Sequence, residues 1–382
     1  MHIRRSFDTR ILVAVLPLLG FGASSSFAEE YPSQKAELEV TKIAGGLDHP
    51  WAVEVLPDGA YIVTERPGRL RIIRDGKVGE PISGLPKVYA EGQGGLLDVA
   101  LAPDFSRSRK LYFTASIPGP GGQGTALFSA TLSQNEDRLD NLTRIFQMNR
   151  FTETEVHFGS RIAVAADGSL FFGIGERGEM DRAQDPRDHA GSILHIEPDG
   201  SIPQDNPFAR SETAAHEIWS IGHRNPQGTV IDPADGKLFV VEHGARGGDE
   251  INAVTAGKNY GWPVIAYGKH YSGAEIGIGQ AAEGYEQPIY YWDPSIAPGA
   301  IDVYHGKMFL EWEGNFLVAA LKYQLLARIE RDDSGTPAHE ERLFEGEFGR
   351  LRDVKVAPDG AVLLVTDEDD GALLRVSRAG AP

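Results

Sequence analysis

A histidine and a glutamate stand near the two ends of one predicted hairpin. His157 lies in HFGSR, before the apolar segment IAV, and Glu176 lies in GERG, after the strand-like segment SLFFGI. If these segments pair, both side chains reach one rim, where the carboxylate would set the tautomer and pKa of the imidazole. Such a pair acts as a general base; the alternative is a structural histidine held by a hydrogen bond. We take His157 and Glu176 as candidate catalytic residues.

A second polar loop precedes a proline. GHRNPQG contains Arg224 and Asn225 before Pro226. A guanidinium and an amide on a rigid loop offer paired donors for a carboxylate or a carbonyl group of a ligand. The alternative is a salt bridge that braces the loop.

Three further cations lie in the last third of the chain. Lys322 occurs in VAALKYQ, and Arg350 and Arg352 occur in FGRLRDV. Residues two apart on a strand point to the same side, so both arginines can face one ligand. In an acidic protein this cluster favours a polyanionic ligand, although surface pairing with Glu345 or Asp353 is the alternative.

The segment VEHGARGGDEINAVTAGKNYGWP combines a glycine-rich turn with acidic residues. Gly244, Gly247 and Gly248 allow the backbone to turn its carbonyl groups inward, and Asp249 and Glu250 add carboxylate oxygens. Main-chain carbonyls and carboxylates are calcium ligands, although the spacing is not that of an EF-hand. The alternative is a tight turn with solvated acids.

Composition excludes several classes of protein. The chain has 382 residues with a formal net charge of −18, which disfavours a nucleic-acid partner, and it has no cysteine, which excludes disulfides and thiolate metal sites. GPGGQG, at residues 119–124, precedes a strand-like segment and no helix, so we expect a hairpin loop there and not a dinucleotide site.

Residues 1–28 have the layout of a secretory signal. Three arginines precede an apolar run over residues 11–21, which ends near the small-residue exit Ser26-Phe27-Ala28. The run is short for a membrane span, so a retained anchor is the weaker alternative. We expect an exported, periplasmic protein whose mature chain has no membrane span.

A repeated phrase indicates the architecture. Asp-Gly turns at residues 58–59, 167–168, 235–236 and 359–360 each lead into an alternating β-branched and aromatic strand. Similar hairpins that recur along a chain are typical of a β-propeller, and about 45–55 residues per blade gives six or seven blades. We therefore expect an all-β propeller over residues 29–382 as one domain, with the strand near residues 37–43 closing the ring; a large β-sandwich is the alternative.

The ordered motifs resemble those of the soluble aldose sugar dehydrogenases, the quinoprotein propellers related to soluble glucose dehydrogenase. The resemblance runs from about Gly46 to Val376 and includes LDHPWAVEVLPDG, GQGGLLDVALAPDF, HFGSR, IPQDNPF, GHRNPQG, EHGARGGDEIN, GKNYGWP, PSIAP and GRLRDVKVAPDG. It implies a six-bladed propeller of four-stranded antiparallel blades that binds pyrroloquinoline quinone (PQQ) and calcium.

The resemblance also implies roles for individual residues. His157 matches the catalytic base. Glu176 stands where the family usually has aspartate, and Ala245 where it usually has proline. The positions implied to hold PQQ are Gln93, Arg224, Asn225, Lys322, Arg350 and Arg352, with Tyr271 as a further candidate for packing near the quinone. The main-chain carbonyls of Gly244 and Ala245 match ligands of the cofactor's calcium, and Glu250 and Tyr260 match a second, structural calcium site.

The implied reaction is oxidation of an aldose sugar to a lactone. His157 would take the proton of the anomeric hydroxyl while hydride passes from C1 to the quinone, which calcium polarises. An external electron acceptor would then reoxidise the cofactor. The alternatives are a calcium-dependent lactonase propeller and a non-catalytic propeller that binds partners. The sequence leaves the choice between a monomer and a dimer open.

Overall fold

The computed structural model describes residues 29–380. The predicted export signal, residues 1–28, lies outside the described residues and stays a prediction. Among residues 29–380, no helix is long and apolar enough to cross a membrane. The three helices assigned there are short: α1 (Phe105–Ser108), η1 (Met180–Gln184) and η2 (Leu310–Trp312).

Strands in chain order form six antiparallel sheets, and five of them have four strands. The first three sheets are β3 (Pro50–Val55), β4 (Tyr61–Glu65), β5 (Arg69–Arg74) and β6 (Lys77–Val78); β7 (Leu96–Leu101), β8 (Lys110–Gly119), β9 (Gly122–Leu132) and β10 (Leu139–Gln147); and β11 (Ile162–Val164), β12 (Leu170–Ile174), β13 (Ser192–Ile196) and β14 (Ile218–Ile221). The next two are β15 (Pro226–Ile231), β16 (Leu238–Glu242), β17 (Asp249–Val254) and β18 (Tyr290–Trp292); and β19 (Pro298–Val303), β20 (Phe316–Ala320), β21 (Leu325–Arg331) and β22 (Pro337–Leu343).

The sixth sheet joins the two ends of the described chain. It contains β23 (Leu351–Val356), β24 (Val362–Thr366) and β25 (Gly371–Arg378), followed by β2 (Glu37–Leu47) and β1 (Glu29–Pro32). β2 runs antiparallel to β25 with Val40 opposite Val376. This pairing confirms the expectation that an early strand closes the ring, and it covers the edge that β25 would otherwise expose.

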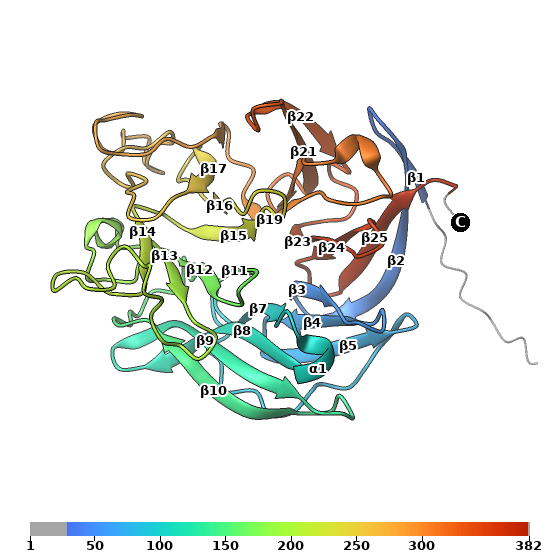
Figure 1. Cartoon of the computed structure of the whole chain (residues 1–382). Helices are drawn as coiled ribbons and strands as arrows, with labels where there is room; N and C mark the ends of the chain where they lie inside the picture. The colour runs from blue at the N-terminus through green and yellow to red at the C-terminus, as the bar shows by residue number, and fades with distance from the viewer. Residues whose placement is uncertain (1–28, 381–382) are drawn as a thin grey trace, which may run out of the picture.

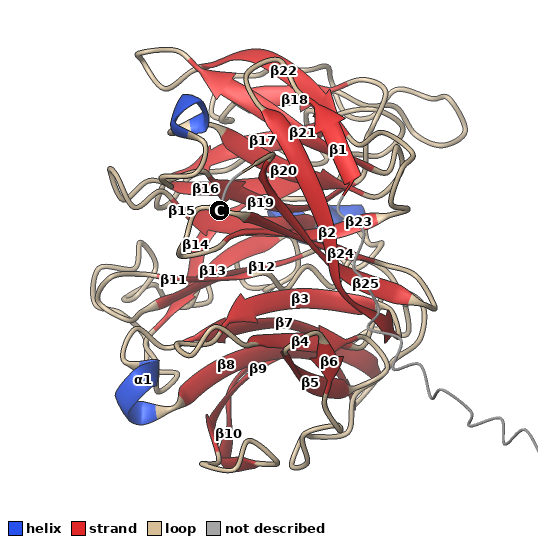
Figure 2. Ribbon diagram, turned by 90° about the vertical axis from the view of Figure 1, so that its right-hand side faces the viewer, coloured by secondary structure: helices blue, strands red, loops and turns tan. Residues whose placement is uncertain are grey.

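The sheets are the blades of a six-bladed β-propeller, as the sequence predicts (Figure 1). The first strand of each blade (β3, β7, β11, β15, β19 and β23) lies nearest the central axis, and the later strands follow outward. In the side view the blades stack around this axis with loops at both ends (Figure 2). Apolar side chains fill the space between neighbouring blades; Trp51, Leu97 and Phe113, for example, pack together between the first two.

The repeated Asp-Gly phrase forms the turn between the first and second strands of a blade. The Asp58 carboxylate accepts a hydrogen bond from the N–H of Ala60 at 3.1 Å, and Gly59 has φ +87°. The same pattern recurs at Asp359, which accepts from the N–H of Ala361 at 3.1 Å. Glycine is needed directly after the aspartate because a left-handed φ is costly for residues with a Cβ. These turns all lie at one end of the channel, so the loops that precede the innermost strands lie at the other end.

Carboxylates on the innermost strands fasten neighbouring blades to each other. Asp98 on β7 accepts from the N–H of Ile162 at 2.7 Å, and Asp353 on β23 accepts from the N–H of Val53 at 2.8 Å. Asp302 on β19 accepts from the N–H of Val356 at 2.7 Å. Hydrogen bonds to a carboxylate are stronger than neutral ones, so they hold the walls of the channel at fixed spacing.

Candidate active site

Two cavities meet at the end of the channel opposite the Asp-Gly turns. One, of about 390 Å³, is lined by loops that precede β3, β7, β11 and β23. The other, of about 610 Å³, is lined by the loops around β15, β17 and β19. Gln93, His243 and Ala297 border both cavities. The site therefore gathers residues from all six blades, which lie far apart in the sequence.

His157 and Glu176 form a close pair in this site. His157 precedes β11 and Glu176 follows β12, and the Nδ1 atom of His157 lies 2.6 Å from Oε1 of Glu176. The predicted hairpin therefore does bring them together. Glu176 is buried, and its second oxygen has no partner among the described residues. Because Glu176 occupies Nδ1, Nε2 is the nitrogen of His157 that remains for a substrate.

The backbone holds the position of His157, and burial lowers the pKa of its imidazole. Its φ is +57°, and its N–H donates to Oε1 of Gln93 at 2.8 Å. Burial lowers the pKa of His157 below its ordinary value of 6.5; the Glu176 carboxylate opposes this shift, and the charge of Arg224 reinforces it. His157 is therefore neutral at physiological pH, the form that a general base requires.

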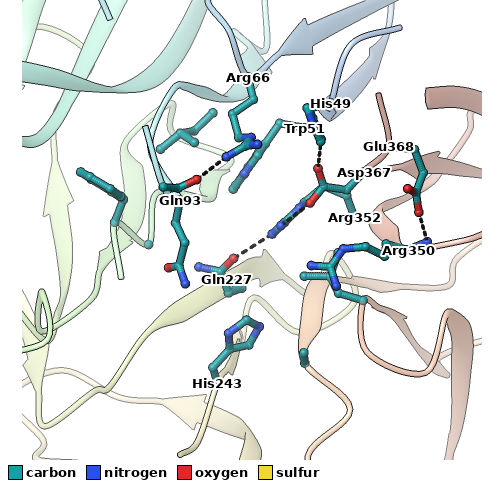
Figure 3. A pocket seen from close by; sticks show the side chains of 16 residues that line it. His49, Trp51, Arg66, Gln93, Gln227, His243, Arg350, Arg352, Asp367 and Glu368 are labelled. Atoms are coloured by element: carbon teal, nitrogen blue, oxygen red, sulfur yellow. Dashed lines mark hydrogen bonds and ion pairs between the residues drawn. The ribbon is translucent and has the colours of Figure 1, made fainter. Parts of the chain in front are cut away.

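Arg350 and Arg352 line the smaller cavity together (Figure 3). Arg352 donates to Oδ2 of Asp367 at 2.8 Å and to Oε1 of Gln227 at 3.0 Å. Neither Glu345 nor Asp353, the partners considered from the sequence, pairs with either arginine among the described residues. Burial alone would raise the pKa of Asp367, but Arg352 holds it well below its ordinary value.

The side chain of Arg350 is exposed and has no carboxylate partner within the described part of the chain; its backbone N–H, not its guanidinium, donates to Glu368 at 3.1 Å. Lys322, which lines the larger cavity, is likewise exposed, and its Nζ lies 5.0 Å from the centre of the Tyr323 ring. The site thus presents cations that no protein carboxylate neutralises in residues 29–380. Such groups can bind an anionic ligand without first breaking an ion pair within the protein.

Arg224 and Asn225 differ in their positions. Arg224 lines the larger cavity and donates to the carbonyl oxygen of His243 at 3.2 Å. Asn225 is fully buried; its amide nitrogen faces the Nδ1 of His243 at 3.5 Å, and its amide oxygen accepts from Gln227 at 3.1 Å. The structure therefore places Asn225 behind the cavity wall, where it holds His243 and Gln227.

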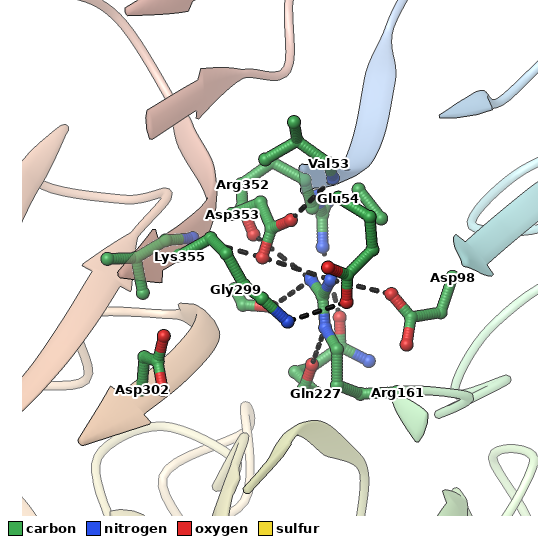
Figure 4. Close-up of polar contacts among 12 residues, drawn as sticks. Val53, Glu54, Asp98, Arg161, Gln227, Gly299, Asp302, Arg352, Asp353 and Lys355 are labelled. Atoms are coloured by element: carbon green, nitrogen blue, oxygen red, sulfur yellow. Dashed lines mark hydrogen bonds and ion pairs between the residues drawn. The ribbon is translucent and has the colours of Figure 1, made fainter. Parts of the chain in front are cut away.

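A buried arginine, Arg161, packs against Trp51, which lines the smaller cavity; Figure 4 shows the polar contacts of this arginine. Arg161 pairs with Asp98 at 2.9 Å and with Asp353 at 3.0 Å. Its guanidinium carbon lies 4.2 Å from the centre of the Trp51 ring, whose other neighbours include Arg352 at 5.8 Å. Arg161 thus connects the fastened innermost strands to the aromatic floor of the site.

The glycine-rich segment turns tightly at the edge of the larger cavity. Gly244, Ala245 and Gly247 all line it, and a Cβ at Gly244 would come within 2.2 Å of the carbonyl oxygen of Gly248. The Gly244 N–H donates to Asp249 at 2.8 Å. Among residues 29–380 no group of three or more His, Cys, Asp or Glu side chains is placed to hold a metal ion. A cation here would need main-chain oxygens, which is the chemistry that suits calcium.

Glu250 and Tyr260 lie outside the two large cavities and border a small one of about 20 Å³. Glu250 stands directly opposite Glu242 in the β16–β17 pair, and burial together with the charge of Glu242 raises the pKa of Glu250 to about 8. The Tyr260 hydroxyl donates to the carbonyl oxygen of Ala253 at 2.7 Å and accepts from the N–H of Thr255 at 2.9 Å. The facing carboxylates of Glu242 and Glu250 could bind a cation between them. The Tyr260 hydroxyl already makes two hydrogen bonds, so only the main-chain carbonyl of Tyr260 could act as a ligand.

Tyr271 lines the larger cavity from an exposed loop, with 69% of its surface accessible. Sequence reasoning missed several lining residues: His49, Trp51, Arg66, Gln227, His243, Asp367 and Glu368. Gln227 and His243 lie within GHRNPQG and EHGARGG, next to predicted site residues, so their place in these motifs could have indicated them. Burial lowers the pKa of His243 to about 3, so this imidazole is neutral beside Arg224 and Arg352.

Comparison with known proteins identifies the family. The glucose/sorbosone dehydrogenase family matches residues 47–375. The chain belongs to this family of oxidoreductases. It is 40% identical over 348 residues to the aldose sugar dehydrogenase YliI of Escherichia coli K12, covering 90% of this chain and 93% of that protein.

Solved structures of the family have the same fold. A crystal structure of a glucose dehydrogenase matches with a TM-score of 0.87 and 40% identity, covering 90% of this chain and 99% of the other. The PQQ-bound aldose sugar dehydrogenase of Streptomyces coelicolor matches with a TM-score of 0.73 and 28% identity, covering 91% and 100%.

Proposed function

We propose that this family member is a PQQ- and calcium-dependent aldose sugar dehydrogenase that oxidises aldoses to lactones and passes the electrons to an external acceptor. The observation that carries the proposal is the His157–Glu176 pair at 2.6 Å beside cavities lined by uncommitted cations. The PQQ-bound relative supports the choice of cofactor.

The lining residues fit a tricarboxylate. Lys322, Arg350 and Arg224 would hold its carboxylates, and Arg352 would contribute from its fixed position against Asp367. The carbonyl groups of Gly244 and Ala245 would hold calcium at the edge of the same cavity. When bound, PQQ supplies an ortho-quinone that accepts a hydride, and calcium makes that quinone more electrophilic.

The protein's own part in the reaction is proton removal and positioning. Nε2 of His157 takes the proton from the anomeric hydroxyl, and the buried Glu176 stabilises the resulting imidazolium. Loss of this proton and of the C1 hydrogen as hydride would convert the sugar to a lactone, and bound PQQ would supply the two-electron acceptor that this oxidation needs. The external acceptor then removes these electrons.

The cofactor part of the proposal is tested by reconstitution. Lys322→Ala should weaken PQQ binding to the apo protein, measured as the PQQ concentration that gives half-maximal dye-linked activity in calcium. Lys237→Ala is the matched control, because Lys237 is an exposed lysine paired with Asp235 on the Asp-Gly turn between β15 and β16. Equal PQQ affinity in both variants contradicts the assignment of Lys322, and no dye reduction with any aldose contradicts the proposed function.

A further inference from the structure

A buried cation lies directly beside the His157–Glu176 pair. Arg177 follows Glu176 in the loop between β12 and η1, and its side chain is fully buried. No carboxylate among the described residues lies within ion-pair distance of its guanidinium. Burying a charged arginine without a carboxylate partner costs folding free energy. Its other contacts must therefore offset this cost.

The contacts of Arg177 are with the segment that carries His157. Its Nη2 donates to the carbonyl oxygen of Thr154 at 2.7 Å, and its Nη1 donates to that of Val156. In return the Thr154 hydroxyl donates to the carbonyl oxygen of Arg177 at 2.6 Å. The guanidinium carbon lies 3.6 Å from the centre of the Phe158 ring, within cation–π distance. Arg177 therefore contacts the residues immediately before and after His157.

The His157 segment needs such support because its backbone is strained. His157 has φ +57° and Ser160 has φ +102°, and such left-handed values are unfavourable at residues other than glycine. A Cβ at Gly175 would lie 2.5 Å from the carbonyl oxygen of His157, so the two segments of the hairpin approach closely. Backbone of this kind persists only where its surroundings hold it.

We propose that Arg177 is a positioning residue for the general base, because it clamps the backbone on both sides of His157 and keeps the imidazole aligned with Glu176 and the cavity. The inference rests on the proposed function, in which His157 takes the proton of the sugar. Arg177 itself touches neither cavity in the described residues. Its effect passes through the position and the charge environment of the imidazole.

The charge of Arg177 gives a second, independent readout. Around His157, the Glu176 carboxylate raises the pKa of the imidazole, whereas burial and the charges of Arg224 and Arg177 lower it. His243, which lines the same cavity, is neutral and adds no charge. Burial, followed by the charge of Arg182, lowers the pKa of Arg177 to about 9, so Arg177 still carries its charge at neutral pH. Removal of that charge should raise the pKa of His157.

The test compares Arg177→Met and Arg177→Lys with the wild type. In Arg177→Met we expect kcat to fall by about 10- to 100-fold, as for a misplaced catalytic group, while the sugar KM and the PQQ affinity change by less than about 2-fold. The acid limb of the kcat profile should move to higher pH, and the imidazole of His157 in the apo protein, followed by NMR, should titrate at higher pH. Arg177→Lys keeps the charge and should leave the titration unchanged, with kcat between the other two.

Arg328→Met is the matched control. Arg328 is also fully buried, and it donates to Asn315 at 2.6 Å and to Glu341 at 2.8 Å, away from both cavities. It should lower stability without moving the acid limb or the titration of His157. Wild-type kcat in Arg177→Met or Arg177→Lys, or an unchanged His157 titration in Arg177→Met, overturns the proposal.

Two other results, a variant that does not fold and a protein that does not have the proposed function, can be told apart from these outcomes. If Arg177→Met does not fold, Arg177→Lys decides, because loss of the two-armed clamp should still lower kcat by about 3- to 10-fold with KM unchanged. If the wild type oxidises no aldose, the proposed function fails, while the NMR titration of the apo variants still tests the link between Arg177 and His157.

Discussion

At the scale of single residues, the chemistry depends on how His157 is kept neutral and aligned. Glu176 fixes one ring nitrogen at 2.6 Å, Gln93 accepts the backbone N–H at 2.8 Å, and burial disfavours the protonated form. A neutral imidazole with a fixed tautomer can accept a proton at once from a bound hydroxyl group. The neighbouring imidazole of His243 cannot replace it, because its Nε2 lies against the Pro298 carbonyl at 2.8 Å and its Nδ1 faces the Asn225 amide at 3.5 Å.

Replacement of the base should abolish most turnover. His157→Gln should lower kcat by at least about 10²-fold while PQQ binding stays nearly intact, because the amide has similar size but cannot accept the proton. Single-turnover reduction of the reconstituted protein by an aldose measures this directly. Near-normal turnover would remove His157 from the role of base.

The pH profile should show the lowered pKa. Because burial lowers the pKa of His157 below 6.5, the base stays deprotonated as pH falls through 6.5, and kcat should decline only at lower pH. Glu176→Gln removes a carboxylate that raises this pKa, so the acid limb should move further toward low pH as kcat also falls. A limb at or above pH 6.5 in the wild type would contradict the assignment.

At the scale of elements, the innermost strands act as a connected wall. Asp353 accepts from the N–H of Val53 and pairs with Arg161, so one carboxylate joins strands of two blades to the arginine under the Trp51 ring. Removal of one partner from a buried ion pair strongly destabilises the folded protein, because the other charge is left buried without compensation. The wall therefore supports both the ring and the floor of the site.

Loss of this carboxylate should be costly. Asp353→Ala should lower the free energy of unfolding by about 3–5 kcal/mol, because it leaves Arg161 under-neutralised and the Val53 N–H without its acceptor. Arg107→Ala is the comparison: this exposed arginine pairs with Asp104 at 2.9 Å, and its loss should cost at most about 1 kcal/mol. Chemical denaturation measures both, and equal costs would refute the role of the wall.

At the scale of the whole molecule, the sequence predicted the architecture from its repeated turns and placed the His157–Glu176 hairpin correctly. It could not show that the Asn225 amide lies against His243 and Gln227, because a loop residue can face either the cavity or the side chains behind it. The partner of Arg352 was also hidden: Asp367 follows β24 in VTDEDD, which resembles an exposed acidic turn. Arg177 gave no signal, since its role depends on backbone carbonyl groups that no side-chain pattern reveals.

Ring closure by β2 should dominate global stability. Removal of residues 29–47 would expose the edge of β25, so we expect a lower unfolding midpoint and self-association, measured by thermal circular dichroism and size-exclusion chromatography. Removal of residues 29–32 alone takes away the outer strand β1 and should have a much smaller effect. Equal midpoints for the two truncations would show that the β2–β25 pairing is dispensable.

The β2–β25 pairing also orders events during synthesis. β2 emerges early from the ribosome, whereas β25 is made only after all the other strands. Five blades can form from neighbouring segments as they appear, but the sixth has to wait for a contact between distant parts of the chain, and such long-range pairing is slow. Until then β2 has no partner strand at the edge that β25 will occupy, so the last blade can be completed only after β25 has been made.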